Sequence, residues 1–274
     1  MCGIAGFSLH GFSRNGSLDQ QTVRSLLQHR GPDDFGTFLS QDTKLGLFHA
    51  RLSILDPSPD GHQPMFSASG NSVIVFNGEI YNFYELRSEL EISGYSFASQ
   101  TDTEVLLSLY EKFKSDFPSF SLVEVATKFV QSLNGIFAFA IWDFESDSLL
   151  LCRDGLGVKP LYYINDNNGF CFASEAKVFS SHHPSIDIPS LNRYLTFLWN
   201  PGCTTADAHV VKVSPGEAII VTNGVIKERF FWYTSPTIIA KLSKKPFSTR
   251  SESIAGSEYF LRQAVHRQLV SDYL

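Results

Sequence analysis

Residues 135–143 constrain the fold most, because this stretch, GIFAFAIWD, is apolar at nearly every position. Alternate side chains of a strand point to opposite faces, so a strand that is apolar on both faces lies at the centre of a covered sheet. We therefore predict a central strand at 135–143 and a second strand at 149–153. The 24 phenylalanines and the hydrophobic fraction of 43% indicate stacked sheets and helices with thick apolar interiors.

The remaining segments predict a fold of mixed class. Further strands are expected at 3–9, 37–39, 45–49, 51–56, 71–76, 161–164, 170–173, 210–213, 218–221 and 225–229. Helical spacing of apolar residues predicts helices at 18–28, 82–93, 101–112, 115–132, 191–197 and 251–274. Because the helices are grouped between the strands rather than alternating with them, we expect an α+β fold with largely antiparallel sheets.

The amino-terminal stretch MCGIAGF contains the first candidate for chemistry. Cys2 follows the initiator methionine directly, and removal of Met1 would leave a cysteine with a thiol and a free α-amine. An α-amine titrates near pH 8, so it can accept the thiol proton and create a nucleophile. The alternative is a first strand that begins with a buried, inert cysteine, and the stretch alone does not decide between the two.

Three further positions carry polar groups in unusual places. Arg51 lies in an otherwise apolar predicted strand, where its guanidinium needs either a ligand anion or a structural ion pair. Asn77 and Gly78 are a strong hairpin-turn signal, but at the end of a strand both could donate hydrogen bonds into a cleft. Thr101 or Asp102 can cap the helix that follows, and a cap carboxylate can keep one oxygen for a ligand ammonium.

The composition excludes several classes of function. The net charge is −6, and the only basic patch, 241–245, is short, so nucleic acid is not expected as a partner. The spacing of the four cysteines fits neither a zinc site nor a disulfide framework, which indicates a reducing compartment and no structural metal. The longest apolar run, 136–142, is too short to span a membrane, and we expect a cytoplasmic protein.

Eight motifs follow one another along the chain and together carry a family resemblance. They are MCGIAGF, HRGPD, RLSILD, FNGEIYN, TDTEV, LNGIFAFAIWD, RDGLGVKPLYY and FASEAK. This series resembles the class II glutamine amidotransferases, in particular the glutaminase domain of glutamine-hydrolysing asparagine synthetases. The resemblance covers roughly residues 2–230. It implies an N-terminal-nucleophile hydrolase fold, an αββα sandwich of two largely antiparallel sheets.

The resemblance also implies roles for the matching residues. Cys2 would attack the side-chain amide of glutamine with its own α-amine as the base. Asn77 through its side chain and Gly78 through its N–H would hold the oxyanion. Arg51 would bind the α-carboxylate and Asp102 the α-ammonium. The rest of the glutamine pocket would be formed by Leu52, Ser53, Ile54, Leu55 and Glu79.

The domain organisation follows from the same resemblance. It implies a glutaminase domain at 2–230, a linker at 231–250, and the first helix of a C-terminal synthetase domain at 251–274. ATP and Mg²⁺ are expected only in that further domain, because the SGGxDS pyrophosphate loop does not occur in this sequence. This chain itself is expected to need no cofactor and no metal. Its expected partners are L-glutamine and the synthetase domain, and a homodimer is left open.

Two alternatives stay open beside asparagine synthesis. The same glutaminase chemistry could serve another acceptor carboxylate, or the domain could be a non-catalytic regulatory module. The second alternative predicts loss of site residues, yet all four of Cys2, Arg51, Asn77 and Asp102 are present. Residues 116–127 look like an insertion for which the sequence offers no function.

Overall fold

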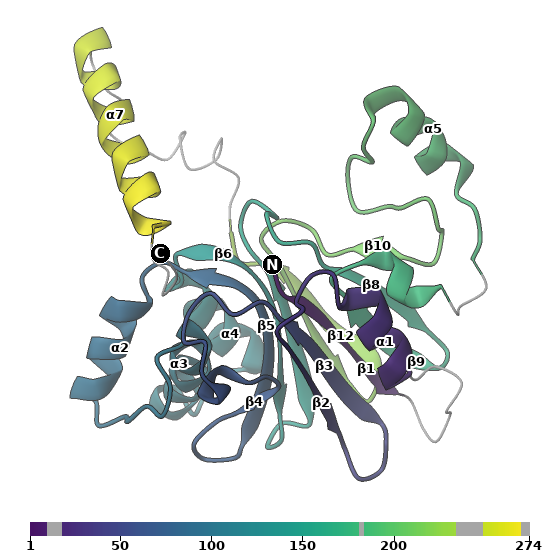
Figure 1. Ribbon diagram of the computed structural model, residues 1–274, viewed down its shortest axis with the longest axis horizontal. Coiled ribbons are helices and arrows are strands. Elements are labelled where there is room, and N and C mark those ends of the chain that lie inside the picture. Colours follow the sequence, from purple (N-terminus) through teal and green to yellow (C-terminus); the bar gives the residue numbers. More distant parts are fainter. Residues whose placement is uncertain (10–17, 181–183, 234–248, 270–274) are drawn as a thin grey trace.

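The computed structural model describes residues 1–9, 18–180, 184–233 and 249–269. Its core is two six-stranded sheets that lie face to face (Figure 1). All strand pairs in both sheets are antiparallel. The predicted α+β class with antiparallel sheets is therefore confirmed.

The first sheet has the strand order β10-β8-β9-β1-β3-β2. Its strands are β1 (Gly3–Leu9), β2 (Asp34–Leu39), β3 (Leu45–Arg51), β8 (Tyr162–Asp166), β9 (Gly169–Ala173) and β10 (Val211–Lys212). The second sheet has the order β12-β11-β7-β6-β5-β4. Its strands are β4 (Met65–Phe66), β5 (Ser72–Ile80), β6 (Gly135–Asp143), β7 (Ser148–Arg153), β11 (Glu217–Thr222) and β12 (Val225–Phe231).

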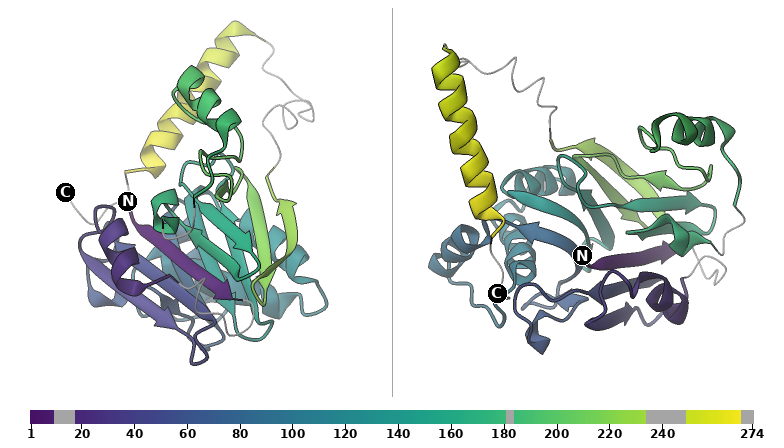
Figure 2. Two further views of the ribbon diagram at one scale, coloured as in Figure 1. Left: turned by 90° about the vertical axis from the view of Figure 1, so that its right-hand side faces the viewer. Right: turned by 45° about the horizontal axis from the view of Figure 1, so that its top comes forward.

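Four of the six described α-helices cover the outer faces of the two sheets. The α-helices are α1 (Gln20–Leu27), α2 (Phe83–Ile92), α3 (Asp102–Asp116), α4 (Leu122–Gln131), α5 (Ile188–Phe197) and α7 (Arg250–Arg267), with short 3₁₀ turns η2 (Pro59–Gly61) and η3 (Ala176–Phe179). Helices α2, α3 and α4 cover the second sheet, and α1 with η3 covers the first (Figure 2). The layers are thus helix, sheet, sheet, helix.

The apolar residues form three cores, one between each pair of neighbouring layers. Strand β6 contributes to two of them. Phe137 and Phe139 pack under the helices, whereas Ala138 and Ala140 face the other sheet. β6 lies between β7 and β5, so the prediction of a central strand that is covered on both faces is confirmed.

The segment 115–132 was predicted as one helix, but it is divided between two. α3 continues to Asp116, and α4 begins at Leu122 after a turn that contains Pro118. A reciprocal capping box starts α4, because the Ser121 side chain accepts from Glu124 N while the Glu124 carboxylate accepts from Ser121 N. The stretch noted as an insertion forms this turn and the first half of α4.

Two expected strand ends also differ from the structure. β5 does not stop at Phe76 but continues through Asn77 and Gly78, in register with β6. Long-range pairing therefore overrides the local turn signal, and glycine is needed at 78 because a Cβ there would overlap the Ile136 carbonyl oxygen. The predicted strand 51–56 is wrong: β3 ends at Arg51, and a left-handed backbone at Asp56 belongs to the loop that follows.

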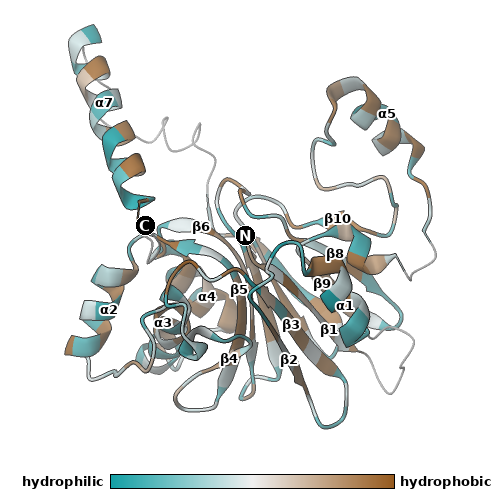
Figure 3. Cartoon of the chain, in the orientation of Figure 1, coloured by the Kyte–Doolittle hydropathy of each residue, from teal (hydrophilic) through white to brown (hydrophobic). Residues whose placement is uncertain are grey.

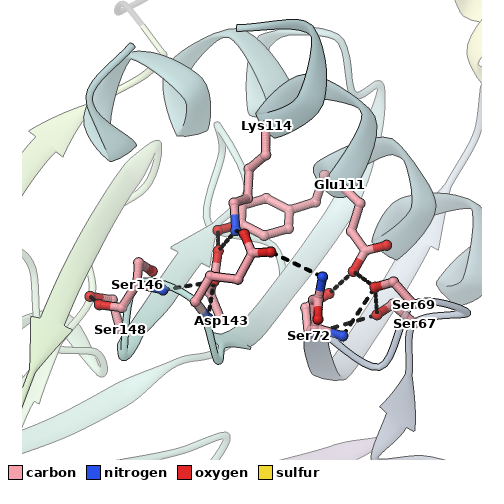
Figure 4. Close-up of polar contacts among 11 residues, drawn as sticks. Ser67, Ser69, Ser72, Glu111, Lys114, Asp143, Ser146 and Ser148 are labelled. Atoms are coloured by element: carbon pink, nitrogen blue, oxygen red, sulfur yellow. Dashed lines mark hydrogen bonds and ion pairs between the residues drawn. The ribbon is translucent and has the colours of Figure 1, made fainter. Parts of the chain in front are cut away.

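A polar network fixes α3 to the second sheet at the end distant from its first residue (Figure 4). Lys114 Nζ lies 2.5 Å from the buried carboxylate of Asp143, which also accepts a 2.7 Å hydrogen bond from Tyr110 Oη. On the neighbouring strand, Ser72 Oγ donates to Glu111 at 2.8 Å. These contacts help to position α3, and with it the residues at its amino-terminal end.

Helices α5 and α7 lie outside the four layers (Figure 1). α7 has no buried residue. Both α5 and α7 carry exposed apolar side chains (Figure 3). Among the described helices, none combines the length and apolar character that a bilayer crossing requires. Most of the predicted linker lies outside the described residues.

Candidate functional site

A pocket at the start of β1 brings together residues from distant parts of the chain. It is lined by Met1, Cys2, Arg51, Leu52, Ile54, Leu55, Gly61, Gln63, Phe76, Asn77, Gly78, Glu79, Thr101, Asp102, Thr103 and Lys159. All the site residues predicted from the sequence are among them except Ser53. Ser53 instead donates its backbone N–H to Asp33 Oδ2 at 2.8 Å.

Cys2 is held against the loop that follows β3. Its Sγ lies 3.4 Å from the backbone nitrogen and 3.5 Å from the carbonyl oxygen of Leu52. Burial raises the pKa of the Cys2 thiol, so the thiol is protonated at neutral pH. A reaction through this sulfur therefore needs a base close to it.

An arginine fixes the backbone of Cys2. Arg30 Nε donates to the Cys2 carbonyl oxygen at 2.9 Å, and Arg30 Nη1 lies 2.9 Å from Glu175 Oε1. Burial opposes ionisation of Glu175, but hydrogen bonds from Arg30, Lys177 and His29 outweigh it and lower the Glu175 pKa to about 2. Both residues lie in motifs of the resemblance, yet no role followed from the motifs alone.

Asn77 presents an unsatisfied amide to the pocket. Its side chain is 1% exposed, and neither Oδ1 nor Nδ2 has a hydrogen-bond partner among the described residues. Leaving a buried polar group unpaired costs about 1–3 kcal/mol. A ligand that accepts from Nδ2 would remove part of this cost, so the amide is suited to an oxyanion.

The N–H of Gly78 is directed to the same side. In an antiparallel ladder, successive residues point their N–H groups to opposite neighbours. Two residues away on either side, Phe76 N donates to Gln63 Oε1 at 2.7 Å and Ile80 N to Asp102 Oδ2 at 3.0 Å. Gly78 N therefore points away from β6 and toward the pocket, between the side chains of Gln63 and Asp102.

Asp102 is the first residue of α3, and its side chain is buried. Burial raises its pKa to about 7, against the hydrogen bond from Ile80, and the nearby charge of Glu79 adds to the rise. Thr101, one residue earlier, is the N-cap and accepts from Glu104 N at 3.2 Å. The cap and the pocket carboxylate are thus two different residues.

Arg51 is 6% exposed and lies at the end of β3. Its guanidinium donates to the carbonyl oxygens of Ser58 at 2.9 Å and Leu55 at 3.3 Å, and also to that of Asp56. Among the described residues, main-chain carbonyls are thus the acceptors of its hydrogen bonds. A Cβ at Gly61 would overlap Arg51 Nη2, so the loop passes closely around the guanidinium.

Two opposite charges complete the polar lining. Burial raises the pKa of Glu79 and lowers that of Lys159, while each charge favours ionisation of the other. Lys159 was not predicted from the sequence. Within the described ranges, no group of three or more His, Cys, Asp or Glu side chains is arranged to hold a metal ion.

Comparison with known proteins agrees with the fold and with the motifs. Two solved structures share the fold at 18% and 20% identity. The glutamine phosphoribosylpyrophosphate amidotransferase of Bacillus subtilis has a TM-score of 0.62 over 86% of this chain and 50% of its own. The second, an allosteric regulatory enzyme of purine biosynthesis, has a TM-score of 0.63 over 85% of this chain and 50% of its own. This chain therefore shares its αββα sandwich with these two enzymes.

Sequence relatives are closer. Asparagine synthetase [glutamine-hydrolyzing] 1 of Bacillus subtilis is 39% identical over 226 residues, which are 81% of this chain and 33% of the relative. Asparagine synthetase [glutamine-hydrolyzing] 3 of the same organism is 31% identical over 99% of this chain and 42% of its own length. The chain thus spans less than half the length of these relatives. The glutamine amidotransferase domain family matches residues 1–232, and the chain belongs to this family.

Proposed function

We propose that this domain hydrolyses the side-chain amide of glutamine through a γ-glutamyl thioester on Cys2. The observation that carries the proposal is the buried amide of Asn77, which has no partner among the described residues and lies next to the inward N–H of Gly78 in the pocket that Cys2 lines. Such a pair of donors suits the oxyanion of an acyl-transfer intermediate. The proposal requires removal of Met1, because only then does Cys2 have a free α-amine.

The reaction is assigned to this chain's own groups. The Cys2 α-amine accepts the thiol proton, and the sulfur attacks the amide carbon of glutamine. The oxyanion that forms accepts hydrogen bonds from Asn77 Nδ2 and Gly78 N. Collapse of this intermediate breaks the carbon–nitrogen bond, and the leaving nitrogen takes the proton from the α-ammonium to give ammonia. Water then attacks the thioester with the same amine as base, which releases glutamate and the thiol.

The head group of glutamine needs one fixed cation and one fixed anion. Arg51 supplies the cation, with the guanidinium held by three loop carbonyls and further N–H groups left for the α-carboxylate. Asp102 and Glu79 supply negative charge for the α-ammonium. The backbone of Leu52, Ile54 and Leu55 forms the remaining wall.

The ammonia is proposed to serve a synthetase domain beyond this chain. Support comes from the relatives, which are named glutamine-hydrolysing asparagine synthetases and of which this chain covers 33% and 42%. On this proposal, 2–230 is the glutaminase domain, 231–250 a linker, and α7 the first helix of the synthetase domain, where ATP and Mg²⁺ would act. A cytoplasmic location would keep the Cys2 thiol reduced.

The glutaminase step is tested by incubating the purified chain with glutamine and measuring glutamate and ammonia. Intact mass first establishes that Met1 is absent. We expect release by the wild type and by Cys203→Ala, which removes an exposed free thiol, but not by Cys2→Ala. Equal glutamate release from the wild type and Cys2→Ala would overturn the proposal.

A further inference from the structure

Lys159 is a buried cation with no assigned role. It lines the pocket together with Cys2 and Glu79 and is 6% exposed. Among the described residues, its Nζ makes no hydrogen bond and no ion pair. A buried lysine usually pairs directly with an acid, because its desolvation is otherwise uncompensated. The positive charge of Lys159 can therefore act on other groups that line or enter the pocket.

The backbone of Lys159 is fixed on both sides. Its N–H donates to Asp154 Oδ2 at 3.0 Å, and its carbonyl oxygen accepts from Arg153 Nε at 2.7 Å. The other oxygen of the Asp154 carboxylate accepts from Leu156 N and Val158 N, which fixes the turn between residues 154 and 159. This turn is a rigid support for the lysine stem.

The same turn is hydrogen-bonded to β6, the strand that pairs with Asn77 and Gly78 of β5. Asp154 N donates to the carbonyl oxygen of Phe137 at 2.8 Å, and Phe137 N donates back to Asp154 Oδ2 at 3.3 Å. Phe137 is the residue that pairs with Gly78. The backbone of Lys159 is thus connected to the oxyanion donor through two residues, so the start of its side chain is fixed relative to the reacting atoms.

From the geometry we propose that the Lys159 ammonium keeps the α-amine of processed Cys2 in its neutral, proton-accepting form. Lys159 would not touch the reacting atoms; it would act through the Cys2 amine by favouring the form that can accept the thiol proton. This inference rests on the proposed glutaminase function. A cation near an amine disfavours the protonated amine, because two like charges would face each other. The opposite effect comes from Glu79, whose carboxylate favours an ammonium.

The charges around the amino terminus come from five elements. Arg30 and Asp33 lie in the turn after α1, Arg51 at the end of β3, Glu79 on β5 and Asp102 on α3. Lys159 comes from the turn before β8. Burial lowers the pKa of the Met1 amine in this structure, and the charges of Arg30 and Lys159 lower it further, whereas those of Cys2 and Asp33 raise it. The α-nitrogen of Cys2 is the next backbone nitrogen after that of Met1, and both residues line the same pocket.

Without Lys159, Arg30 would still disfavour an α-ammonium, but less positive charge would oppose the carboxylate of Glu79. Glu79 would then favour an α-ammonium, which cannot take the thiol proton. A like charge close to a partly buried amine changes its pKa by about one unit. We therefore expect the lysine to extend glutaminase activity to lower pH by about one unit.

The test compares the pH dependence of kcat for glutamine hydrolysis in the wild type, Lys159→Met and Lys159→Arg. kcat reports groups in the enzyme–substrate complex, where Asp102 is paired with the substrate ammonium and does not titrate as in the free site. Lys227→Met is the matched control, because Lys227 is exposed on edge strand β12. Thermal unfolding confirms that each variant folds.

We expect the acid limb of Lys159→Met to lie about one pH unit higher, with turnover about tenfold lower on that limb. Lys159→Arg and Lys227→Met should keep the wild-type limb, since the first retains the charge and the second leaves the pocket unchanged. A Lys159→Met profile that coincides with that of an active wild type overturns this inference alone. A processed wild type that releases no glutamate at any pH overturns the proposed function.

A second readout does not depend on turnover. In a Cys2→Ser background, the rate of α-amine acylation against pH measures the titration of the amine itself. Adding Lys159→Met should raise the midpoint of this titration by about one unit. An unchanged midpoint in this background contradicts the inference even if Lys159→Met proves inactive for another reason.

Discussion

Asp102 Oδ2 accepts a 3.0 Å hydrogen bond from the backbone nitrogen of Ile80, two residues beyond the glycine that supplies the proposed oxyanion donor. The contact joins the first residue of α3 to the end of β5. The carboxylate that would bind the substrate ammonium is therefore positioned by the same strand that holds Asn77 and Gly78. Head-group recognition and oxyanion stabilisation share one rigid support.

Asp102 makes glutamine binding depend on pH. Burial raises its pKa to about 7 in the free domain, so below that pH the carboxyl is mostly neutral and cannot pair with an ammonium. We expect KM for glutamine to fall as pH rises to about 7 and then to level off. The Asp102→Asn variant should show a raised KM without this dependence, as measured by steady-state kinetics between about pH 5 and 9. A wild-type KM that is constant across the range would contradict the assignment.

The same carboxyl should destabilise the free domain as pH rises. A folded pKa above the unfolded value means that the native state binds more protons between about pH 4 and 7, so the free energy of unfolding falls across this window. The shift corresponds to at most about 4 kcal/mol. Denaturant unfolding of Asp102→Asn should lack this fall, and saturating glutamine should reduce it in the wild type. Parallel pH–stability curves for variant and wild type would be the contrary result.

Asn77→Ala should separate activity from stability. Loss of one oxyanion donor lowers kcat by about a hundredfold to a thousandfold, with little change in KM. The free energy of unfolding should change little, because the variant removes a buried amide that has no partner in the described part of the chain. Asn71→Ala is the control, since Asn71 donates to Glu145 on an exposed surface. A large loss of stability with unchanged kcat would place Asn77 in a structural role.

Local patterns predicted the layers better than the site. The run 135–143 is buried on both faces as expected, because side-chain alternation is a local property. The Asn77-Gly78 turn signal failed, because pairing with residues far along the chain overrides turn propensity. Arg30 and Glu175 are 145 residues apart, and no spacing rule links them. Residue type and position made Cys2, Arg51, Asn77 and Asp102 candidates but left functional and structural interpretations open, and the family resemblance favoured the functional one.

Glu175→Gln should loosen Cys2 without removing a group that touches substrate. Arg30 would lose its anionic partner while still donating to the Cys2 carbonyl oxygen, so we expect kcat to fall by about tenfold with KM unchanged. Glu175 ionises more readily in the folded state, so its contribution of about 1 kcal/mol is present above about pH 4.5 and is lost as pH falls toward 2. Stability of variant and wild type should therefore converge in acid. A constant difference down to pH 2 would refute this linkage.

Gly61→Ala should disturb the guanidinium that binds the substrate carboxylate. The new Cβ would overlap Arg51 Nη2, and the far end of a side chain moves more easily than backbone, so the domain should still fold. The shifted guanidinium would meet the α-carboxylate at a poorer angle, and we expect KM to rise by about tenfold with a smaller change in kcat. Gly70→Ala is the control for a glycine substitution away from the pocket. A Cβ at Gly70 meets open space, but the φ of +76° is unfavourable for alanine. This variant should therefore lose about 1 kcal/mol of stability with unchanged KM. Equal KM values for the two variants would show that Arg51 does not bind the head group.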